Sequence, residues 1–167
     1  ENALRRAAIP YELVGGTPFY QRREIKDLLA YLRLSVNDVD DLAFRRVLNV
    51  PKRGIGKTSL DRIAAFAFRE GLAHLAAARR IGEEVDITAS TRGKIQRFVR
   101  IIDDLRNQLD RPVGDVLMAL VEALDYGRHL ALDDPETAPE RSDNGEELIV
   151  GARQFAERAP EPTVAAF

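Results

Sequence analysis

The sequence predicts an all-α fold, and two observations carry this prediction. Apolar residues recur at intervals of three and four along most of the 167 residues, which places them on one face of a helix. Only residues 11–14 have the composition of a strand, and no second segment offers them a partner. We therefore expect a multi-helix domain with a short orphan strand near its N-terminus.

The first third of the chain predicts three helices. Two are expected over about residues 1–8 and 19–36, with Gly15-Gly16 breaking the chain before the second. Asp40 is expected to cap a short third helix, because its carboxylate can accept hydrogen bonds from the free amides of a first turn. The predicted apolar stripe of this third helix is Leu42, Val47 and Leu48.

The rest of the chain predicts five further helices. One follows a glycine turn and ends at Gly71, another begins at Leu72, and Ser90 is expected to cap a long one. Pro112 is expected to start the next helix, and a loop over 132–141 to precede the last one, over about 142–157. The predicted stripe after the glycine turn is Leu60, Ile63, Ala64, Ala67 and Phe68; that of the long helix is Ile95, Phe98, Ile101, Ile102, Leu105 and Leu109.

The composition is that of an ordinary globular domain, with 45% hydrophobic and 31% charged residues. No apolar run approaches the roughly 20 residues that a membrane span requires. There is no cysteine for disulfides or thiolate metal sites, and His74 and His129 lack partners at ligand spacing. We expect a cytoplasmic protein without a metal or a cofactor of its own in this segment.

Charge is unevenly distributed, although its net value is only −2. Residues 45–62 carry six cationic side chains against Asp61 alone, and residues 92–100 carry four with no acid. Residues 133–147 are strongly acidic. Local patches decide where a polyanion can bind, so the two basic segments are the candidate sites and the acidic segment is excluded from such contact.

The stretch PKRGIGKTSL, residues 51–60, resembles the end of a phosphate-binding loop of nucleotide hydrolases. Such a loop requires a glycine five residues before Gly56, and Pro51 stands there instead. Proline lacks the amide that would wrap a phosphate. The only candidate for a magnesium-binding acid, Asp103-Asp104, falls on the solvated face of a predicted helix. The sequence therefore argues against nucleotide hydrolysis and predicts no catalytic residue.

A helix-hairpin-helix fits this stretch better. Glycines 54 and 56 can adopt positive φ or allow close approach, and Ile55 is expected to pack between the helices. The free amides at the start of the second helix attract anions. The predicted DNA-backbone contacts are Lys52, Arg53, Gly54, Ile55, Gly56, Lys57 and Thr58; the alternative is a glycine turn with solvated charges.

A second basic patch lies at the predicted start of the long helix. Cations at a helix N-terminus oppose the helix dipole, which an external anion would offset. The residues of this possible second phosphate site are Ser90, Thr91, Arg92 and Lys94. A solvated helix face is the alternative explanation.

Three segments resemble one family specifically: GGTPFYQRREIKD, AYLRL and NVPKRGIGKTSL, within residues 15–60. They resemble the UvrD/PcrA/Rep type of superfamily 1 DNA helicase, at the end of the second RecA-like motor domain and the start of its inserted 2B subdomain. Residues 121–130 and 141–149 are similar to later parts of this subdomain, the latter through Arg141, Asn144, Glu147 and Leu148. The resemblance implies a motor-domain end over 1–16, a helical 2B-type subdomain over 17–158 and the start of a return linker over 159–167.

The resemblance also implies a role. The parent enzyme would unwind DNA in the 3′-to-5′ direction with ATP and Mg²⁺ bound outside this segment, in the bacterial cytoplasm at the nucleoid. This segment would be an accessory domain contacting duplex DNA near a single-strand junction, with the motor domains and repair proteins as partners. Arg22, Glu24, Lys26 and Asp27 would make polar contacts between domains; contact with DNA and a solvated helix face are the alternatives. The alternative is a helical protein-interaction or autoinhibitory module without DNA contact.

Overall fold

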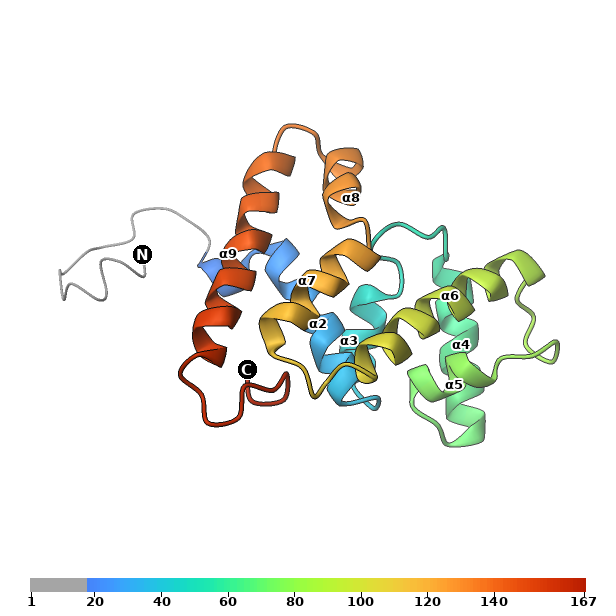
Figure 1. Cartoon of the computed structure of the whole chain (residues 1–167). Helices are drawn as coiled ribbons and strands as arrows, with labels where there is room; N and C mark the ends of the chain where they lie inside the picture. Colours follow the sequence, from blue (N-terminus) through green and yellow to red (C-terminus); the bar gives the residue numbers. More distant parts are fainter. Residues whose placement is uncertain (1–17) are drawn as a thin grey trace.

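The computed structural model describes residues 18–167, and every regular element in that range is a helix (Figure 1). The all-α prediction is therefore confirmed for the described residues, whereas the helix and strand predicted over 1–14 lie outside them. The elements are η1 (Phe19–Gln21), α2 (Arg23–Val36), α3 (Asp41–Val47), α4 (Lys57–Glu70), α5 (His74–Arg80), α6 (Ala89–Arg106), α7 (Val113–Ala123), α8 (Tyr126–Asp133) and α9 (Ala138–Ala156).

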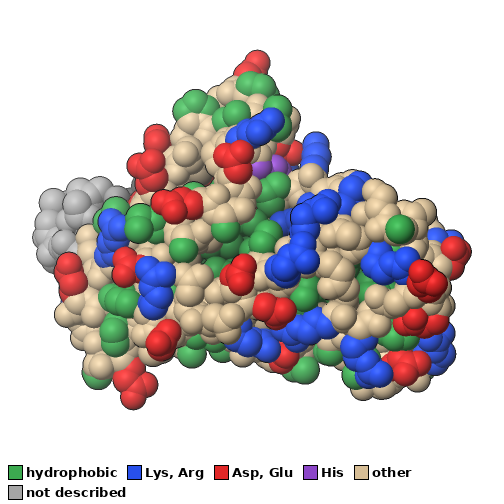
Figure 2. Space-filling view, turned by 45° about the vertical axis from the view of Figure 1, so that its right-hand side comes forward, with side chains coloured by type: hydrophobic (Ala, Val, Ile, Leu, Met, Phe, Trp, Pro, Cys, Tyr) green, Lys and Arg blue, Asp and Glu red, His purple; other side chains and the backbone are tan. Residues whose placement is uncertain are grey.

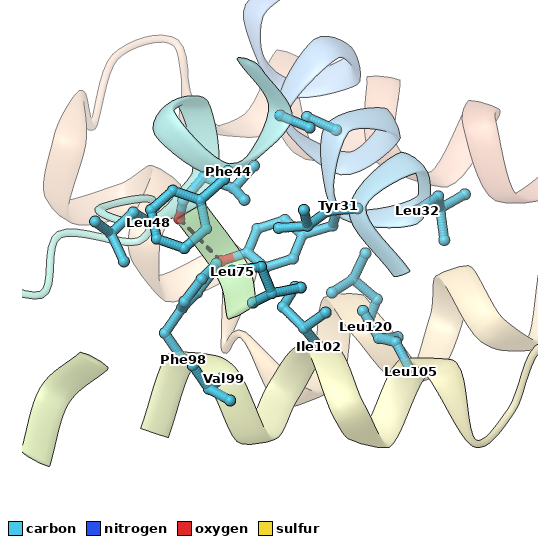
Figure 3. Close-up of a cluster of buried hydrophobic side chains, with 14 of the residues drawn as sticks. Tyr31, Leu32, Phe44, Leu48, Leu75, Phe98, Val99, Ile102, Leu105 and Leu120 are labelled. Carbon is cyan, nitrogen blue, oxygen red and sulfur yellow. Dashed lines mark hydrogen bonds between the residues drawn. The ribbon is translucent and has the colours of Figure 1, made fainter. Parts of the chain in front are cut away.

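Helix α2 lies at the centre and packs against α3, α6, α7 and α9. Its apolar residues face several neighbours at once. Tyr31, Phe44 and Phe98, from α2, α3 and α6, are fully buried and their rings lie against one another (Figure 3). Burying a large apolar side chain stabilises a fold by about 1.5–3 kcal/mol, so this cluster fixes the three helices relative to one another.

The long helix α6 joins two groups of helices (Figure 1). One part packs on α5, which in turn packs on α4, while α6 also contacts α2 and α7. Its N-cap is Thr88, whose hydroxyl accepts a hydrogen bond from the Thr91 amide at 3.2 Å. The prediction of Ser90 as the cap was wrong by two positions, since Ser90 already lies inside the helix.

The loop predicted over 132–141 was also wrong in extent. Helix α8 extends through Leu132 and Asp133, and α9 begins at Ala138, so that only 134–137 connect the two. Pro139 lies in the first turn of α9, where the missing proline amide costs no helical hydrogen bond. The prediction treated this proline and its acidic neighbours as loop residues, although both are compatible with a helix start.

Two predicted stripe residues face solvent. The side chains of Phe68 and Leu42 are 91% and 79% exposed. Helix α4 instead buries Ile63, Phe66 and Ala67. Its end is as predicted: Gly71 adopts φ +64° at the C-cap, a conformation that glycine accepts without strain.

The C-terminal residues fold back onto the helices. The Val113 amide donates to the Pro162 carbonyl at 3.2 Å, and the Phe167 ring lies against Phe155. A single hydrogen-bonded turn starts at Thr163. Within the described part of the chain, no helix combines the length and apolarity needed to cross a membrane.

Candidate nucleic-acid interface

The basic turn lies between α3 and α4. Helix α4 begins at Lys57, directly after Gly54-Ile55-Gly56, as expected for a helix-hairpin-helix. However, α3 already ends at Val47, and residues 48–56 form an irregular segment with a cis peptide bond between Val50 and Pro51. The helix-hairpin-helix thus stays a prediction in its detail, because only its second helix follows the glycines directly.

The two glycines of the turn differ. Gly54 adopts φ +66°, which only glycine accepts readily. Gly56 has φ −74°, and a Cβ added there would meet no atom within 4 Å. Ile55 between them is 5% exposed and joins the core, as predicted. Gly54 is therefore needed for the turn itself, whereas Gly56 leaves open space in front of α4.

The start of α4 carries free donors. The first amides of a helix have no partner within it. Here no side chain caps them, and the first turn contains no acidic residue. Lys57 and Thr58 are exposed at this end. Free amides, the helix dipole and a lysine together favour an anion at this position.

Arg53 points into the protein. Its guanidinium donates to the carbonyls of Val47, Leu48 and Val50, each at 3.0 Å. These carbonyls lie at and beyond the C-terminal end of α3, where a cation is stabilised by the helix dipole. The guanidinium also lies 5.2 Å above the Phe98 ring. DNA contact by Arg53 stays untested, but its hydrogen bonds show that it fixes the turn.

Two further residues hold the turn, and the sequence reasoning missed both. The Tyr31 hydroxyl accepts from Arg53 at 2.6 Å and donates to the Val50 carbonyl. Burial raises the pKa of Tyr31 to about 12, so it stays a neutral donor. The Asn49 side chain accepts from the amides of Arg53 and Ile55. An asparagine just before the Pro-Lys-Arg run was the signal available in the sequence.

The second predicted site is divided by the structure. Lys94 lies beside the turn, because a Cβ built on Gly54 would be 3.1 Å from its ammonium nitrogen. Arg92 instead donates to the Gly82 carbonyl, and Thr91 bonds to Thr88. Ser90 is exposed. The structure thus brings Lys94 to the turn and assigns Arg92 to the loop before α6.

The four residues predicted to contact other domains lie in a different region, at the start of α2. Glu24 and Asp27 are only 4% and 2% exposed. The buried Asn144 amide donates to Glu24 at 2.7 Å and accepts from Arg22, and Arg141 lies 3.4 Å from Glu24. Arg46 pairs with Asp27 at 2.7 Å, while Lys26 is partly exposed. The interdomain role stays a prediction, but three of the four serve contacts within this domain.

Asp133, at the end of α8, lies between the two regions. Its carboxylate is 3.1 Å from Arg141, 3.2 Å from Arg23 and 3.5 Å from Lys52 of the turn. The hydrogen bond from Arg141 and the nearby cations lower the pKa of Asp133. Lys52 remains 75% exposed, so its contact with Asp133 leaves it accessible to other anions.

Both histidines are buried. Burial lowers the pKa of His74 and of His129, which keeps them neutral at physiological pH. The His74 amide donates to Asp41 at 2.8 Å. No group of three or more potential ligands that could hold a metal ion exists among the described residues.

The described residues thus form a helical domain in which free helix amides and lysines lie at one glycine turn. Comparison with known proteins gives its family. Residues 1–78 match the UvrD-like helicase C-terminal domain family. The chain is 34% identical to the ATP-dependent DNA helicase PcrA of Bacillus subtilis over 100% of its own length and 23% of that relative.

Two further relatives give the same result. UvrD1 of Mycobacterium tuberculosis is 39% identical over 93% of the chain and 20% of the relative. DNA helicase II of Escherichia coli is 35% identical over 93% of the chain and 22% of the relative. The chain belongs to the UvrD/PcrA-type superfamily 1 DNA helicases. It spans about a fifth to a quarter of the length of these relatives.

Proposed function

We propose that this chain is an accessory domain of an ATP-dependent 3′-to-5′ DNA helicase. It holds the backbone of double-stranded DNA at the turn before α4, near a junction with single-stranded DNA, without reading the sequence. The motor domains of the same protein bind ATP and Mg²⁺ and supply the catalysis. The observation that carries this proposal is the open space at Gly56, beside the free amides of α4 and the exposed Lys57.

Three ammonium groups surround the turn. Lys52 and Lys57 are exposed, and Lys94 approaches from α6. Together with the amides of Lys57 and Thr58 they can neutralise about three phosphates. Figure 2 shows Lys and Arg side chains gathered across the middle of one face, beside a hydrophobic area. Contacts of this kind position a duplex but carry no base information.

The test is a fluorescence-anisotropy titration of labelled duplex DNA at several salt concentrations. About three neutralised phosphates predict that log K falls with log salt at a slope near −3, with Kd on the order of 10⁻⁴ to 10⁻⁶ M at physiological salt. Lys57→Ala is expected to reduce the slope by about one unit for every duplex sequence. A salt-independent signal would rule out phosphate contact.

A matched control is Arg158→Ala. Arg158 is exposed and follows α9, and α9 lies on the opposite side of the molecule from α4 in Figure 1. The Arg158→Ala variant removes one positive charge, as Lys57→Ala does. General electrostatic attraction therefore predicts the same loss of duplex affinity in both variants. Contact at the turn predicts a loss of duplex affinity in Lys57→Ala alone.

The alternative function, a protein-interaction or autoinhibitory module, is favoured by a different surface. Glu140, Glu146 and Glu147 are exposed on α9, and such an acidic face repels DNA. If DNA binding fails and charge reversal on α9 changes helicase activity of the complete protein, this alternative replaces the first. In both cases we expect no ATP hydrolysis by the chain itself.

A further inference from the structure

A cavity opens beside the turn, between α6 and the end of α7. Its volume is about 280 Å³, near the lower end of the roughly 300–1,000 Å³ typical of small-ligand sites. It could hold one unit of a nucleic-acid strand but not a longer segment. Its lining includes Pro51, Arg53, Lys94, Arg97, Ile101 and Leu124.

The charge of this cavity is of one sign. Arg53, Lys94 and Arg97 line it, and no acidic residue does. Other arginines of the domain pair with carboxylates, as Arg79 and Arg106 do with Asp38. Lys94 and Arg97 form no ion pair or hydrogen bond with any described residue. Two unpaired cations at the rim favour an anionic ligand.

The uncharged residues of the lining are all apolar. Three of them, Pro51, Ile101 and Leu124, are called the floor below, and Leu124 is 6% exposed. A paired duplex turns its phosphates outward and keeps its bases stacked, so its backbone would gain little from such a floor. An unpaired nucleotide exposes the face of its base, which an apolar surface can cover while cations hold the phosphate.

We propose that this cavity binds one unpaired nucleotide of the strand that leaves the duplex held at the turn. Lys94 and Arg97 contact its phosphate, and the floor of Pro51, Ile101 and Leu124 covers its base. The proposal rests on the proposed function, since the duplex contact brings the strand to the cavity. Lys94, which lies beside Gly54, belongs to both sites.

The experiment measures the binding of three labelled DNAs to the 167-residue chain. They are a blunt duplex, the same duplex with a single-stranded extension of about ten nucleotides, and the duplex with an abasic extension of equal length. We expect the DNA whose extension carries bases to bind about fivefold more tightly than the DNA with the abasic extension. This gain is at the low end of the range for stacking one base on a protein surface, because the floor is aliphatic and not aromatic. Equal affinity for the two extensions would overturn the proposal, because both carry the same phosphates.

Variants locate the effect. Arg97→Gln is expected to weaken binding of both extended DNAs several-fold, because it removes a phosphate contact, and to leave blunt-duplex affinity within about twofold. Arg100→Gln is the matched control, because Arg100 is exposed on the same helix and does not line the cavity. Ala123→Glu places a carboxylate at the exposed rim of the cavity and is expected to act like Arg97→Gln. Unchanged binding of both extended DNAs by the two cavity variants would contradict the proposal.

The two proposals fail in different ways. Lys57→Ala should weaken all three DNAs by the same factor, because it acts at the turn. If blunt duplex binds as expected but bases in the extension add nothing, only the cavity proposal is wrong. If blunt duplex does not bind while the extension binds through Arg97, the duplex function is wrong, and the cavity binds a nucleotide without a duplex held at the turn.

Discussion

The turn before α4 and the polar cluster between α2 and α9 both carry charged side chains, but these side chains have different surroundings. At the turn, Lys57 and Lys94 are free of partners among the described residues, and the amides of α4 are uncapped. In the cluster, Glu24 and Asn144 are buried and bonded to each other and to arginines. The first region is available for an external anion, whereas the second holds the helices together.

The difference lies in desolvation. A buried charge is tolerated only when partners replace its water, so each member of the cluster depends on the others. An exposed lysine keeps its water and loses it only when a ligand arrives. Sequence motifs do not report this distinction, because Glu24 and Lys57 both lie in segments that resemble the same family.

The largest expected effect breaks the cluster. Glu24→Ala leaves the buried Asn144 amide without its acceptor and takes from Arg141 one of its two carboxylates, so that only Asp133 remains. Loss of one partner of a buried charge pair typically costs about 3–5 kcal/mol, and we expect this decrease in the free energy of unfolding in urea. DNA affinity of the folded fraction should not change.

Its control is Glu147→Ala on α9. Glu147 is exposed, and substitutions at such positions usually change stability by less than about 0.5 kcal/mol. Equal losses in the two variants would show that the buried contacts of Glu24 do not hold the helices together.

The second prediction separates the two glycines of the turn. Gly54→Val forces a β-branched residue to φ +66° and toward the Lys94 ammonium, and strain of this kind costs about 1–3 kcal/mol. Gly56→Val fills only open space, so it should change stability much less and instead weaken duplex binding. Thermal unfolding and anisotropy on both variants measure the two effects. Normal duplex binding by Gly56→Val would contradict the proposed contact.

The sequence predicted the helices well where apolar spacing is regular, as in α2 and α6, although it misplaced the cap of α6 by two positions, and it predicted the burial of Ile55. It failed where two structures suit the same residues. Pro139 and its acidic neighbours fit both a loop and a helix start. Phe68 lies one position from a stripe whose true members are Phe66 and Ala67.

The sequence predicted the residues of the candidate turn itself, but it did not predict which residues from other segments contact that turn. Lys52, Lys57 and the glycines are contiguous, so sequence alone places them together. Lys94 reaches the turn only through the packing of α6, and Arg53 turns inward because Tyr31 and the end of α3 offer acceptors. Such contacts between distant segments follow from tertiary packing, which a single sequence does not specify.

The third prediction concerns the pH dependence of stability. It uses two carboxylates, Asp133 and Asp27, whose pKa values are shifted in opposite directions. The hydrogen bond from Arg141 lowers the pKa of Asp133 below its ordinary 3.8. Its contribution to stability is therefore present above that value and is lost as pH falls through the pKa of the folded state. Asp133→Asn should cost about 1 kcal/mol at pH 7, as for a partly exposed ion pair, and progressively less below pH 4.

Asp27 should behave in the opposite way. Burial raises its pKa above 3.8 despite Arg46 nearby, so the folded protein binds a proton there more readily and gains stability as pH falls. Asp27→Asn removes this gain and should steepen the loss of stability in acid, whereas Asp133→Asn should flatten it. Urea unfolding from pH 7 to 3 measures both slopes. Parallel pH profiles for the two variants would show that the cluster does not distinguish its carboxylates in this way.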